Sequence, residues 1–464
     1  MDTGRKLTGL RRFLRPEVLI WVLLLLLLAE RLWLFRELGV EYMSHSDDDA
    51  YIESGLFFAR TGVISMWVPY PSAMIMPAMP VVIGLFSKLF GSGPALKLAL
   101  KLLWILLGVA TAGLCYRAVS LRASKWAGLL SAALFLTPNM AWMNHVLLTE
   151  TPYLFFFTLC VYETLRMERS GKKRCFAIYL LSFLAALMFR SNAVTLPLFT
   201  GAYLLLRRQD RRLLLRRALV LLTALLLFVV PWSIRNYRQF GAFAPLSYGA
   251  GNPLLLGTYQ GEGFPADQEL DYVANVDAVM AERYAAYYKA EPEPWPEERG
   301  DDILVRYDPE GKVKEPRHAQ YLSLQADGIK ARYRLREWWA NNPVSLLKSY
   351  LLIKPRWMLN WSWAWEEVMG VSYQTLHRLS QLNFLFCILT VVLSLARKRY
   401  RPEVLFLTGL YFALVYIHAL AFVSDRYAST LIGLRYLLAG YGASLLLELI
   451  LDTHKMLKKH FIAP

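Results

Sequence analysis

The chain has 464 residues, of which 56% are hydrophobic and only 19% are charged, and its mean hydropathy is +0.32. Soluble domains contain about 45–50% apolar and about 25% charged residues. This composition therefore excludes a purely soluble protein, a disordered chain and a collagen-like repeat. Four cysteines in a chain of this length also exclude a small disulfide-rich scaffold.

The formal net charge of +16 could by itself indicate nucleic-acid binding. The position of the charge along the chain decides between a nucleic-acid-binding protein and a membrane protein. Residues 236–345 hold 17 acidic and 12 basic residues, so the basic excess lies elsewhere in the chain. It is concentrated in short runs between apolar stretches, at residues 5–15, 117–125, 166–174, 207–217, 397–401 and 455–459. This is the positive-inside pattern of a multi-pass membrane protein, and it excludes a nucleic-acid partner.

A spanning helix needs about 20 mostly apolar residues. Ten stretches qualify: 17–38, 94–116, 124–142, 152–168, 175–190, 192–206, 213–234, 379–396, 403–422 and 428–451. Because the basic runs lie between alternate stretches, we predict that both termini are cytoplasmic, in a plasma or inner membrane. The apolar segment 346–364 is interrupted by charged residues and a proline, and we expect it in the outer interface; a tilted or broken span is the alternative.

The spans divide the chain into three parts. Residues 1–235 form an N-terminal transmembrane module with a first outer loop at 39–92, and residues 379–464 form the C-terminal helices. Residues 236–378 form a small extracytoplasmic domain that is α-rich or mixed. Within the first outer loop, we expect juxtamembrane helices at 49–62 and 77–91 that cover a cavity at the membrane boundary.

Three consecutive carboxylates, Asp47, Asp48 and Asp49, follow the first span. Acidic residues favour helix N-termini, and capping alone is one explanation for them. One acid would satisfy that role, however, whereas three neighbouring carboxylates repel one another and raise the pKa of at least one. The run therefore favours a general base or a cation site.

Other charged residues are expected at the outer ends of spans. Glu150 precedes the fourth span, where it either faces the cavity or is simply an acid at a helix start. Three arginines follow or precede later spans against the positive-inside rule: Arg190, Arg235 and Arg426. Each arginine could be a snorkelling anchor. Together with the acids they favour an anion site, because a guanidinium binds phosphate in a planar fork. His418, inside the ninth span, could be a polar contact between helices or a residue of a transport pathway, and we favour the contact.

These residues carry a family resemblance. The string Asp48-Asp49-Ala50-Tyr51, followed by Leu56, Ala59 and Gly62, resembles the first outer loop of the GT-C membrane glycosyltransferases. The similarity is to the protein O-mannosyltransferase family (glycosyltransferase family 39) and the bacterial aminoarabinose transferases. Asp49 stands where that loop usually has Glu, and Ile52 where it has a second Tyr. Thr149-Glu150, Phe189-Arg190, Arg235-Asn236-Tyr237 and Arg426-Tyr427 follow in the family's order.

The resemblance implies an all-α GT-C fold and an enzyme that moves a sugar from a polyprenyl-phosphate carrier to an acceptor hydroxyl or phosphate outside the membrane, with inversion. It implies that Asp48 is the base, with Asp49 and Glu150 as its catalytic neighbours. The donor phosphate and substrate would be bound by Arg190, Arg235, Arg426, Tyr51, His45 and Asp47. The sugar is not assigned, and the acceptor could be a protein, a glycolipid such as lipid A, or a cell-wall polymer.

A divalent cation is a further option. Asp48, Asp49 and Glu150, with His45 or His145, offer oxygen and nitrogen ligands, although no spacing such as His-x-x-x-His supports a metal site. Two other functions compete with the glycosyltransferase. A transporter or lipid flippase would need charges at mid-bilayer, whereas a non-catalytic receptor would bind the sugar carrier without turnover.

Overall fold

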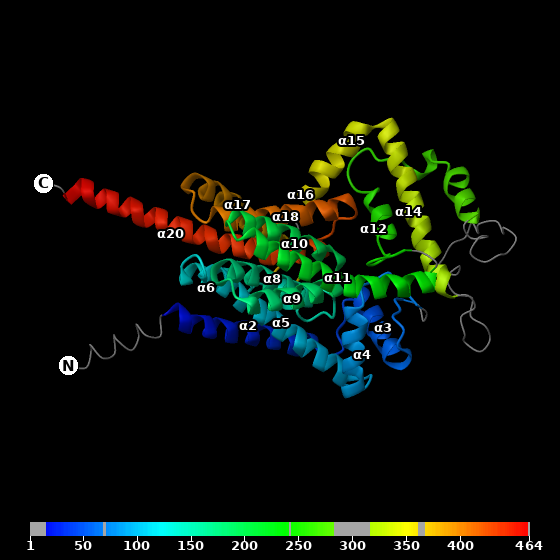
Figure 1. The fold of residues 1–464 in the computed structure, drawn as a ribbon, viewed down its shortest axis with the longest axis horizontal. Coiled ribbons are helices and arrows are strands. Elements are labelled where there is room, and N and C mark those ends of the chain that lie inside the picture. The colour runs from blue at the N-terminus through cyan, green and yellow to red at the C-terminus, as the bar shows by residue number, and fades with distance from the viewer. Residues whose placement is uncertain (1–14, 68–70, 241–242, 283–315, 361–366, 463–464) are drawn as a thin grey trace.

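The computed structural model describes residues 15–67, 71–240, 243–282, 316–360 and 367–462. Most of the first basic run, and the part of the predicted interfacial helix after residue 360, lie outside these residues. Within the described part, the protein is all-α, apart from one isolated bridge between Val368 and Val371. The helices of its bundle lie along the long axis of the molecule, whereas several helices of the first outer loop and of the segment 236–378 run across that axis at one end (Figure 1).

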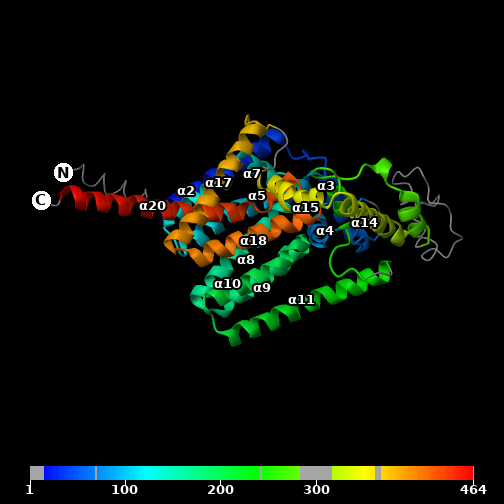
Figure 2. The ribbon, with the colours of Figure 1, turned by 90° about the horizontal axis from the view of Figure 1, so that it is seen from above.

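Six helices are long and apolar enough to cross a membrane. They are α2 (Pro16–Leu38), α5 (Pro94–Ser120), α11 (Arg211–Phe240), α17 (Tyr373–Arg397), α18 (Arg401–Leu420) and α20 (Ile432–Ile462). The chain is therefore a polytopic membrane protein, as its composition predicted. Figure 2 shows α11 along one edge of the bundle, and its leucines, such as Leu227 at 73% exposure, suit a lipid-facing surface.

Shorter or less apolar helices occupy the other four predicted spans. They are α6 (Lys125–Ala133), α7 (Pro138–Met143), α8 (Glu150–Ser170), α9 (Lys173–Phe189) and α10 (Leu196–Leu206), which a 3₁₀ turn, η1 (Ser191–Thr195), joins to α9. The total of ten spans stays a prediction.

The helix expected at 124–142 is broken between α6 and α7. Pro138 lacks a backbone N–H and disfavours helical geometry at Thr137, which accounts for the interruption. The buried Arg31 of α2 compensates for it, since its Nη2 donates to the Phe135 carbonyl at 3.1 Å and its Nε donates to Asn144 Oδ1 at 2.8 Å. An arginine in an apolar span thus satisfies polar groups that the break leaves free.

The two helices predicted in the first outer loop are present as α3 (Asp47–Thr61) and α4 (Ala78–Phe90). Gly62 ends α3 with a φ of 71°, a left-handed conformation that glycine adopts without strain. The two helices pack closely at Gly55, where an added Cβ would lie 2.4 Å or less from Ile83 side-chain atoms.

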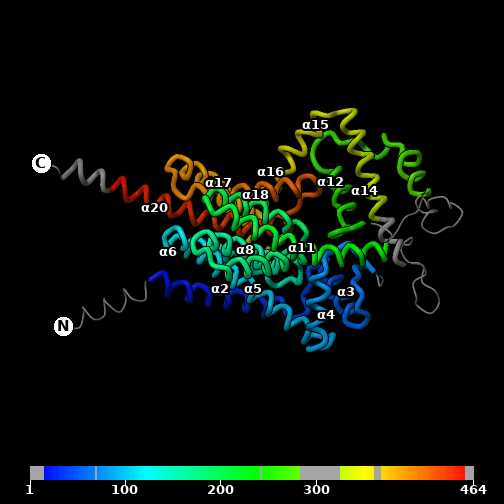
Figure 3. The backbone as a smooth tube through the Cα atoms, in the orientation of Figure 1, coloured from blue at the N-terminus to red at the C-terminus, as the bar shows by residue number. Residues whose placement is uncertain are grey.

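The remaining helices belong to the segment 236–378. They are α12 (Gly251–Gly257), α14 (Pro316–Asn341), α15 (Pro343–Lys348) and α16 (Lys354–Asn360), with short turns η2 (Asp267–Glu269), η3 (Val273–Asp277) and η5 (Ser349–Ile353). With α3 and α4 they gather at one end of the bundle, whereas α2 begins and α20 ends at the opposite end (Figure 3). A last short helix, α19 (Asp425–Ser429), connects α18 to α20.

Basic residues lie at the end where α2 begins. Lys125 pairs with Glu17, Arg207 Nε lies 2.8 Å from Glu168 Oε1, and Arg397 Nη1 lies 3.0 Å from Asp452 Oδ2. The two ends of the bundle therefore differ: one carries basic runs, and the other carries the outer helices and the site described next.

Candidate active site

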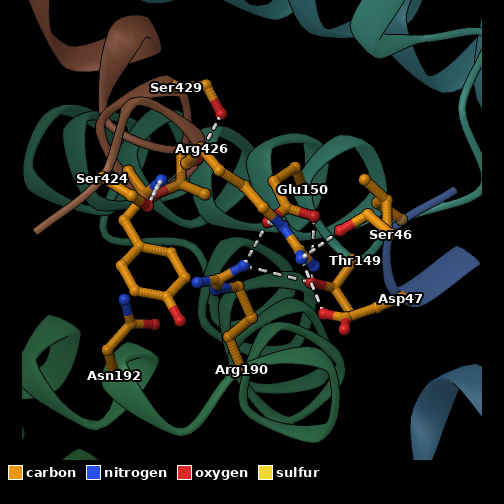
Figure 4. A network of polar contacts seen from close by, with 12 residues as sticks. Ser46, Asp47, Thr149, Glu150, Arg190, Asn192, Ser424, Arg426 and Ser429 are labelled. Atoms are coloured by element: carbon orange, nitrogen blue, oxygen red, sulfur yellow. Dashed lines mark hydrogen bonds and ion pairs between the residues drawn. The ribbon is translucent and has the colours of Figure 1, made fainter. Parts of the chain in front are cut away.

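Four charged side chains, three from separate helices and one from the residue that follows α9, meet at the outer-helix end of the bundle (Figure 4). Arg190 Nη1 lies 2.7 Å from Glu150 Oε1, and Arg426 Nε lies 2.7 Å from the same oxygen. Arg426 Nη1 also lies 2.6 Å from Asp47 Oδ2. We call Asp47, Glu150, Arg190 and Arg426 the charged cluster.

Each member of the charged cluster stands at a helix end, which fixes its position. Asp47 and Glu150 are the first residues of α3 and α8. Arg190 follows α9 in an extended conformation, with φ −147° and ψ 126°, before the chain turns into η1. Arg426 lies in α19, whose N-terminus is capped by Ser424 accepting from the Tyr427 N–H.

The electrostatics of the cluster centre on Glu150, which is fully buried. A buried carboxylate without partners would be costly, so the two guanidinium groups are needed to offset its charge. The two arginines carry two positive charges and the two carboxylates carry two negative charges, so the formal charge of the cluster is zero. The side chains of Asp47, Arg190 and Arg426 keep 27%, 13% and 15% exposure, so a ligand can reach these three but not Glu150.

Arg190 keeps hydrogen-bonding capacity for a ligand. Its Nη1 donates to both Glu150 Oε1 and Thr149 Oγ1, whereas its Nε and Nη2 make no hydrogen bond to the described residues. Its guanidinium also lies over the Tyr427 ring, 5.1 Å from the centroid. A guanidinium has five N–H donors in one plane, so Arg190 can be oriented by Glu150 and still bind an anion.

A cavity of about 470 Å³ opens beside the cluster. Of the cluster, Asp47, Arg190 and Arg426 line it, with Tyr51 beside Asp47. Burial raises the pKa of the Tyr51 phenol, which keeps it a neutral hydrogen-bonding group. The remaining walls of the cavity come from the first outer loop, from the start of the 236–378 segment and from the outer ends of α9 and α18. The residues that form these walls include Met66, Trp67, Met74, Ile75, Met76, Asn192, Ser247, Asn252, His418 and Tyr427.

Asp48, the predicted base, lies apart from the charged cluster. It is fully buried, its Oδ2 accepts from the Ser44 N–H at 2.6 Å, and its Oδ1 accepts from the Ser46 N–H at 3.1 Å. It therefore fixes the loop that enters α3. Asp49 is exposed, and its Oδ2 lies 3.5 Å from His45 Nδ1. Within the described part of the chain, neither residue forms an ion pair with a member of the charged cluster.

Arg235, a predicted phosphate ligand, is also separate. Its Nη1 donates to the Ser72 carbonyl at 2.7 Å and its Nη2 to the Ile64 carbonyl at 3.3 Å, while its guanidinium lies over Trp232. These contacts attach the first outer loop to α11, which is a structural role.

The predicted metal ligands are not brought together. Asp48 faces backbone N–H groups, Glu150 faces arginines, and His145 is buried with its Nε2 3.1 Å from Lys101 Nζ. Within the part of the chain that the structure describes, no three His, Cys, Asp or Glu side chains gather in a way that could hold a metal ion.

Some cavity residues were not predicted from the sequence. Thr149 and Asn192 flank predicted residues in the chain, and this proximity to Glu150 and Arg190 was their only signal. His418 was predicted to be a polar contact between helices, and its Nε2 does lie 3.2 Å from Asn192 Nδ2. That prediction is confirmed, and His418 also lines the cavity.

Comparison with known proteins tests the family resemblance. Residues 71–234 match the family model described as dolichyl-phosphate-mannose-protein mannosyltransferase. The predicted family resemblance is confirmed. The matched segment runs from the first outer loop through most of α11 and includes Glu150 and Arg190. No curated protein sequence matches the chain at a significant level.

Solved structures show the fold. The archaeal oligosaccharyltransferase AglB from Archaeoglobus fulgidus, in complex with an inhibitory peptide and a dolichol-phosphate, aligns over 97% of this chain with a TM-score of 0.54 and 13% identity. The alignment covers 52% of AglB, so this chain spans about half its length. ArnT from Cupriavidus metallidurans bound to undecaprenyl phosphate aligns over 91% of this chain and 78% of its own, with a TM-score of 0.41 and 15% identity.

Proposed function

We propose that this protein is a membrane glycosyltransferase that moves a sugar from a polyprenyl-phosphate carrier to an acceptor at the outer face of the membrane. The observation that carries the proposal is the charged cluster, in which an oriented arginine with free donors lines a cavity beside a partly exposed carboxylate. The match of residues 71–234 to a lipid-phosphate-dependent mannosyltransferase family supports the same reaction class.

The reaction is a single displacement. An acceptor hydroxyl attacks the anomeric carbon, the bond from that carbon to the phosphate oxygen breaks, and the configuration inverts. Polyprenyl phosphate leaves with an added negative charge, which the Nε and Nη2 groups of Arg190 can stabilise by hydrogen bonds that strengthen as the charge develops. Because phosphate is a good leaving group, no acid is required to protonate it.

The base in this proposal is Asp47 rather than Asp48. Asp47 lines the cavity, and its Oδ2 contacts Arg426. Its Oδ1 has no ion-pair partner among the described residues, so this oxygen is open to the hydroxyl of an acceptor. Both oxygens of Asp48 already accept backbone N–H groups. Glu150 orients Arg190 and Arg426, and Asp48 shapes the loop that presents Asp47.

The same proposal assigns an orientation to the molecule. We place the basic end of the bundle and both termini on the cytoplasmic side of the plasma or inner membrane, by the positive-inside rule. The charged cluster then faces outward, and the extracytoplasmic segment 236–378 covers it, since Ser247 and Asn252 line the cavity. A lipid-linked donor would enter from the bilayer, and the acceptor would be a protein, a glycolipid or a cell-wall polymer.

The test is release of undecaprenyl phosphate from a panel of undecaprenyl-phosphate sugars, supplied with membrane lipids and peptides as acceptors. We expect release by the native protein and a fall of roughly 10²–10⁴-fold in Asp47→Asn. Glu53→Gln changes an exposed carboxylate on the same helix and is the matched control. Tight binding of every donor without release would contradict the transferase and favour a receptor; absence of both binding and release would favour a transporter.

A further inference from the structure

Asn192 and His418 form a polar pair in the cavity wall that the proposed reaction does not use. Asn192 lies in η1, two residues after Arg190, and His418 lies in the last turn of α18. Asn192 Nδ2 lies 3.2 Å from His418 Nε2. Both residues line the cavity, and Figure 4 shows the Asn192 side chain on the same side of the cluster as Arg190.

The pair is incompletely hydrogen-bonded. Asn192 Oδ1 is buried and has no hydrogen-bond partner among the described residues. When Asn192 Nδ2 donates to His418 Nε2, the imidazole proton is on Nδ1, which likewise makes no hydrogen bond to the described part of the chain. Turning the amide over would exchange donor and acceptor but would still leave one amide atom unpaired. A buried polar atom without a partner is costly, so its presence in a cavity wall points to a ligand.

Tyr427 connects this pair to the anion-binding arginine. The His418 ring stacks on the Tyr427 ring with 4.9 Å between centroids and 23° between planes. The Arg190 guanidinium lies 5.1 Å from the centroid of the same Tyr427 ring. The Asn192–His418 pair and the Arg190 guanidinium, which has free N–H donors, therefore lie close to the same aromatic ring.

The chemistry of the pair selects one kind of ligand group. A hydroxyl both donates and accepts, so it can satisfy Asn192 Oδ1 and the neighbouring imidazole, in either amide orientation. A ligand that has hydroxyls close to a phosphate can contact both the pair and Arg190, because His418 and Arg190 both lie against the Tyr427 ring. Resting on the proposed function, we infer that Asn192 and His418 bind a ring hydroxyl of the donor sugar and thereby determine which sugar is transferred.

A site built to hydrogen-bond a hydroxyl strongly rejects an analogue that lacks it, because its own polar groups are then left unpaired. The probes are undecaprenyl phosphate alone and undecaprenyl-phosphate glucose, galactose and mannose, each with its monodeoxy analogues. Dissociation constants and, where release occurs, kcat/KM are measured for the native protein, Asn192→Leu and His418→Phe. Leucine keeps the branched shape of the amide without its polar atoms, and phenylalanine keeps the stacking on Tyr427.

We expect the native protein to prefer one sugar over the analogue lacking one hydroxyl by ~10²-fold or more, and each variant to reduce that ratio to within ~10-fold. Asn275→Leu is the matched control, since this amide is not among the residues that line the cavity and donates from Nδ2 to the Asp271 carbonyl at 2.9 Å. Its sugar preference should stay native. Thermal unfolding of each variant in detergent separates loss of the pair from loss of the fold.

The outcomes separate this inference from the proposed function. An unchanged preference in folded Asn192→Leu would overturn the inference, even if the enzyme transfers sugar. Equal affinity of the native protein for bare undecaprenyl phosphate and for every sugar-bearing form would also overturn it. If the native protein transfers nothing but binds one sugar form tightly through Asn192, the binding of a sugar hydroxyl by the pair holds, whereas the transferase and the role of the pair in transfer do not.

Discussion

Arg190 Nη1 and Glu150 Oε1 lie 2.7 Å apart, between a fully buried carboxylate and an arginine that reaches the cavity. The contact joins the end of α9 to the start of α8. It also orients the Arg190 guanidinium, which lines the cavity where a ligand would bind. Because Arg426 Nε contacts the same oxygen, Glu150 organises both arginines. The charged cluster therefore depends on one residue that no ligand is expected to touch.

Replacing Glu150 by Gln should lower both activity and stability. The amide keeps the shape but removes the charge that offsets two arginines, and breaking a buried ion pair costs about 3–5 kcal/mol. We expect a lower free energy of unfolding in detergent and weaker donor turnover. In a double-mutant cycle with Arg190→Gln, the two losses should be strongly non-additive. Additive losses would show that the two side chains are not coupled.

Asp48→Ala tests the structural role of the predicted base. The change leaves the N–H groups of Ser44 and Ser46 without their acceptor, and such groups cost about 1–3 kcal/mol each when buried. We expect Asp48→Ala to unfold at a lower temperature and to keep part of its activity. Adding a stabilising lipid should restore part of the activity that is lost. Asp47→Asn should show the opposite behaviour, with native stability and little activity. Native unfolding of Asp48→Ala combined with complete inactivity would return the base to Asp48.

Asp425 should make stability dependent on pH. Burial raises its pKa to about 6, from an ordinary value of 3.8, and Tyr373 Oη donates to its Oδ2 at 3.2 Å. Between pH 4 and pH 6 the folded state holds a proton that the unfolded state has lost, so the stability contributed by this group falls as pH rises. The full change is about 3 kcal/mol.

The measurement is the unfolding temperature from pH 4 to pH 8 for the native protein and Asp425→Asn. The asparagine stays neutral and still accepts from Tyr373, so its stability should vary less with pH and exceed the native value at pH 8. Parallel pH curves for the two proteins would contradict the raised pKa.

Much of this architecture could be predicted from the sequence, because an apolar stretch of about 20 residues is a local property. The positive-inside pattern then assigned Glu150, Arg190 and Arg426 to one end of the bundle, where the structure brings them together. The choice between Asp47 and Asp48 was beyond such reasoning. Adjacent residues on a helix point about 100° apart, and which one faces the cavity depends on the Ser44–Ser46 loop.

Arg235 and the helix break show a second limit. Arg235 has the same sequence signature as Arg190, yet it binds carbonyl groups of Ser72 and Ile64 in a loop far away in the chain. Pro138 accounts for the break after α6, but the contact that satisfies the Phe135 carbonyl there comes from Arg31 of another helix, α2. Hydropathy describes each span by itself, and these contacts arise only when the spans pack together.

The proposed orientation predicts which side of the membrane each end of the bundle faces. All four native cysteines are buried, so an introduced exposed cysteine can be labelled over a low background. Thr61→Cys lies at the end of α3 beside the outer helices, and Lys172→Cys lies between α8 and α9 at the basic end; both positions are exposed. In intact cells, a membrane-impermeant maleimide should label Thr61→Cys and should label Lys172→Cys only after permeabilisation. The reverse pattern would place the charged cluster in the cytoplasm, where it could not meet an acceptor outside the membrane, and would overturn the proposed topology together with the extracytoplasmic reaction.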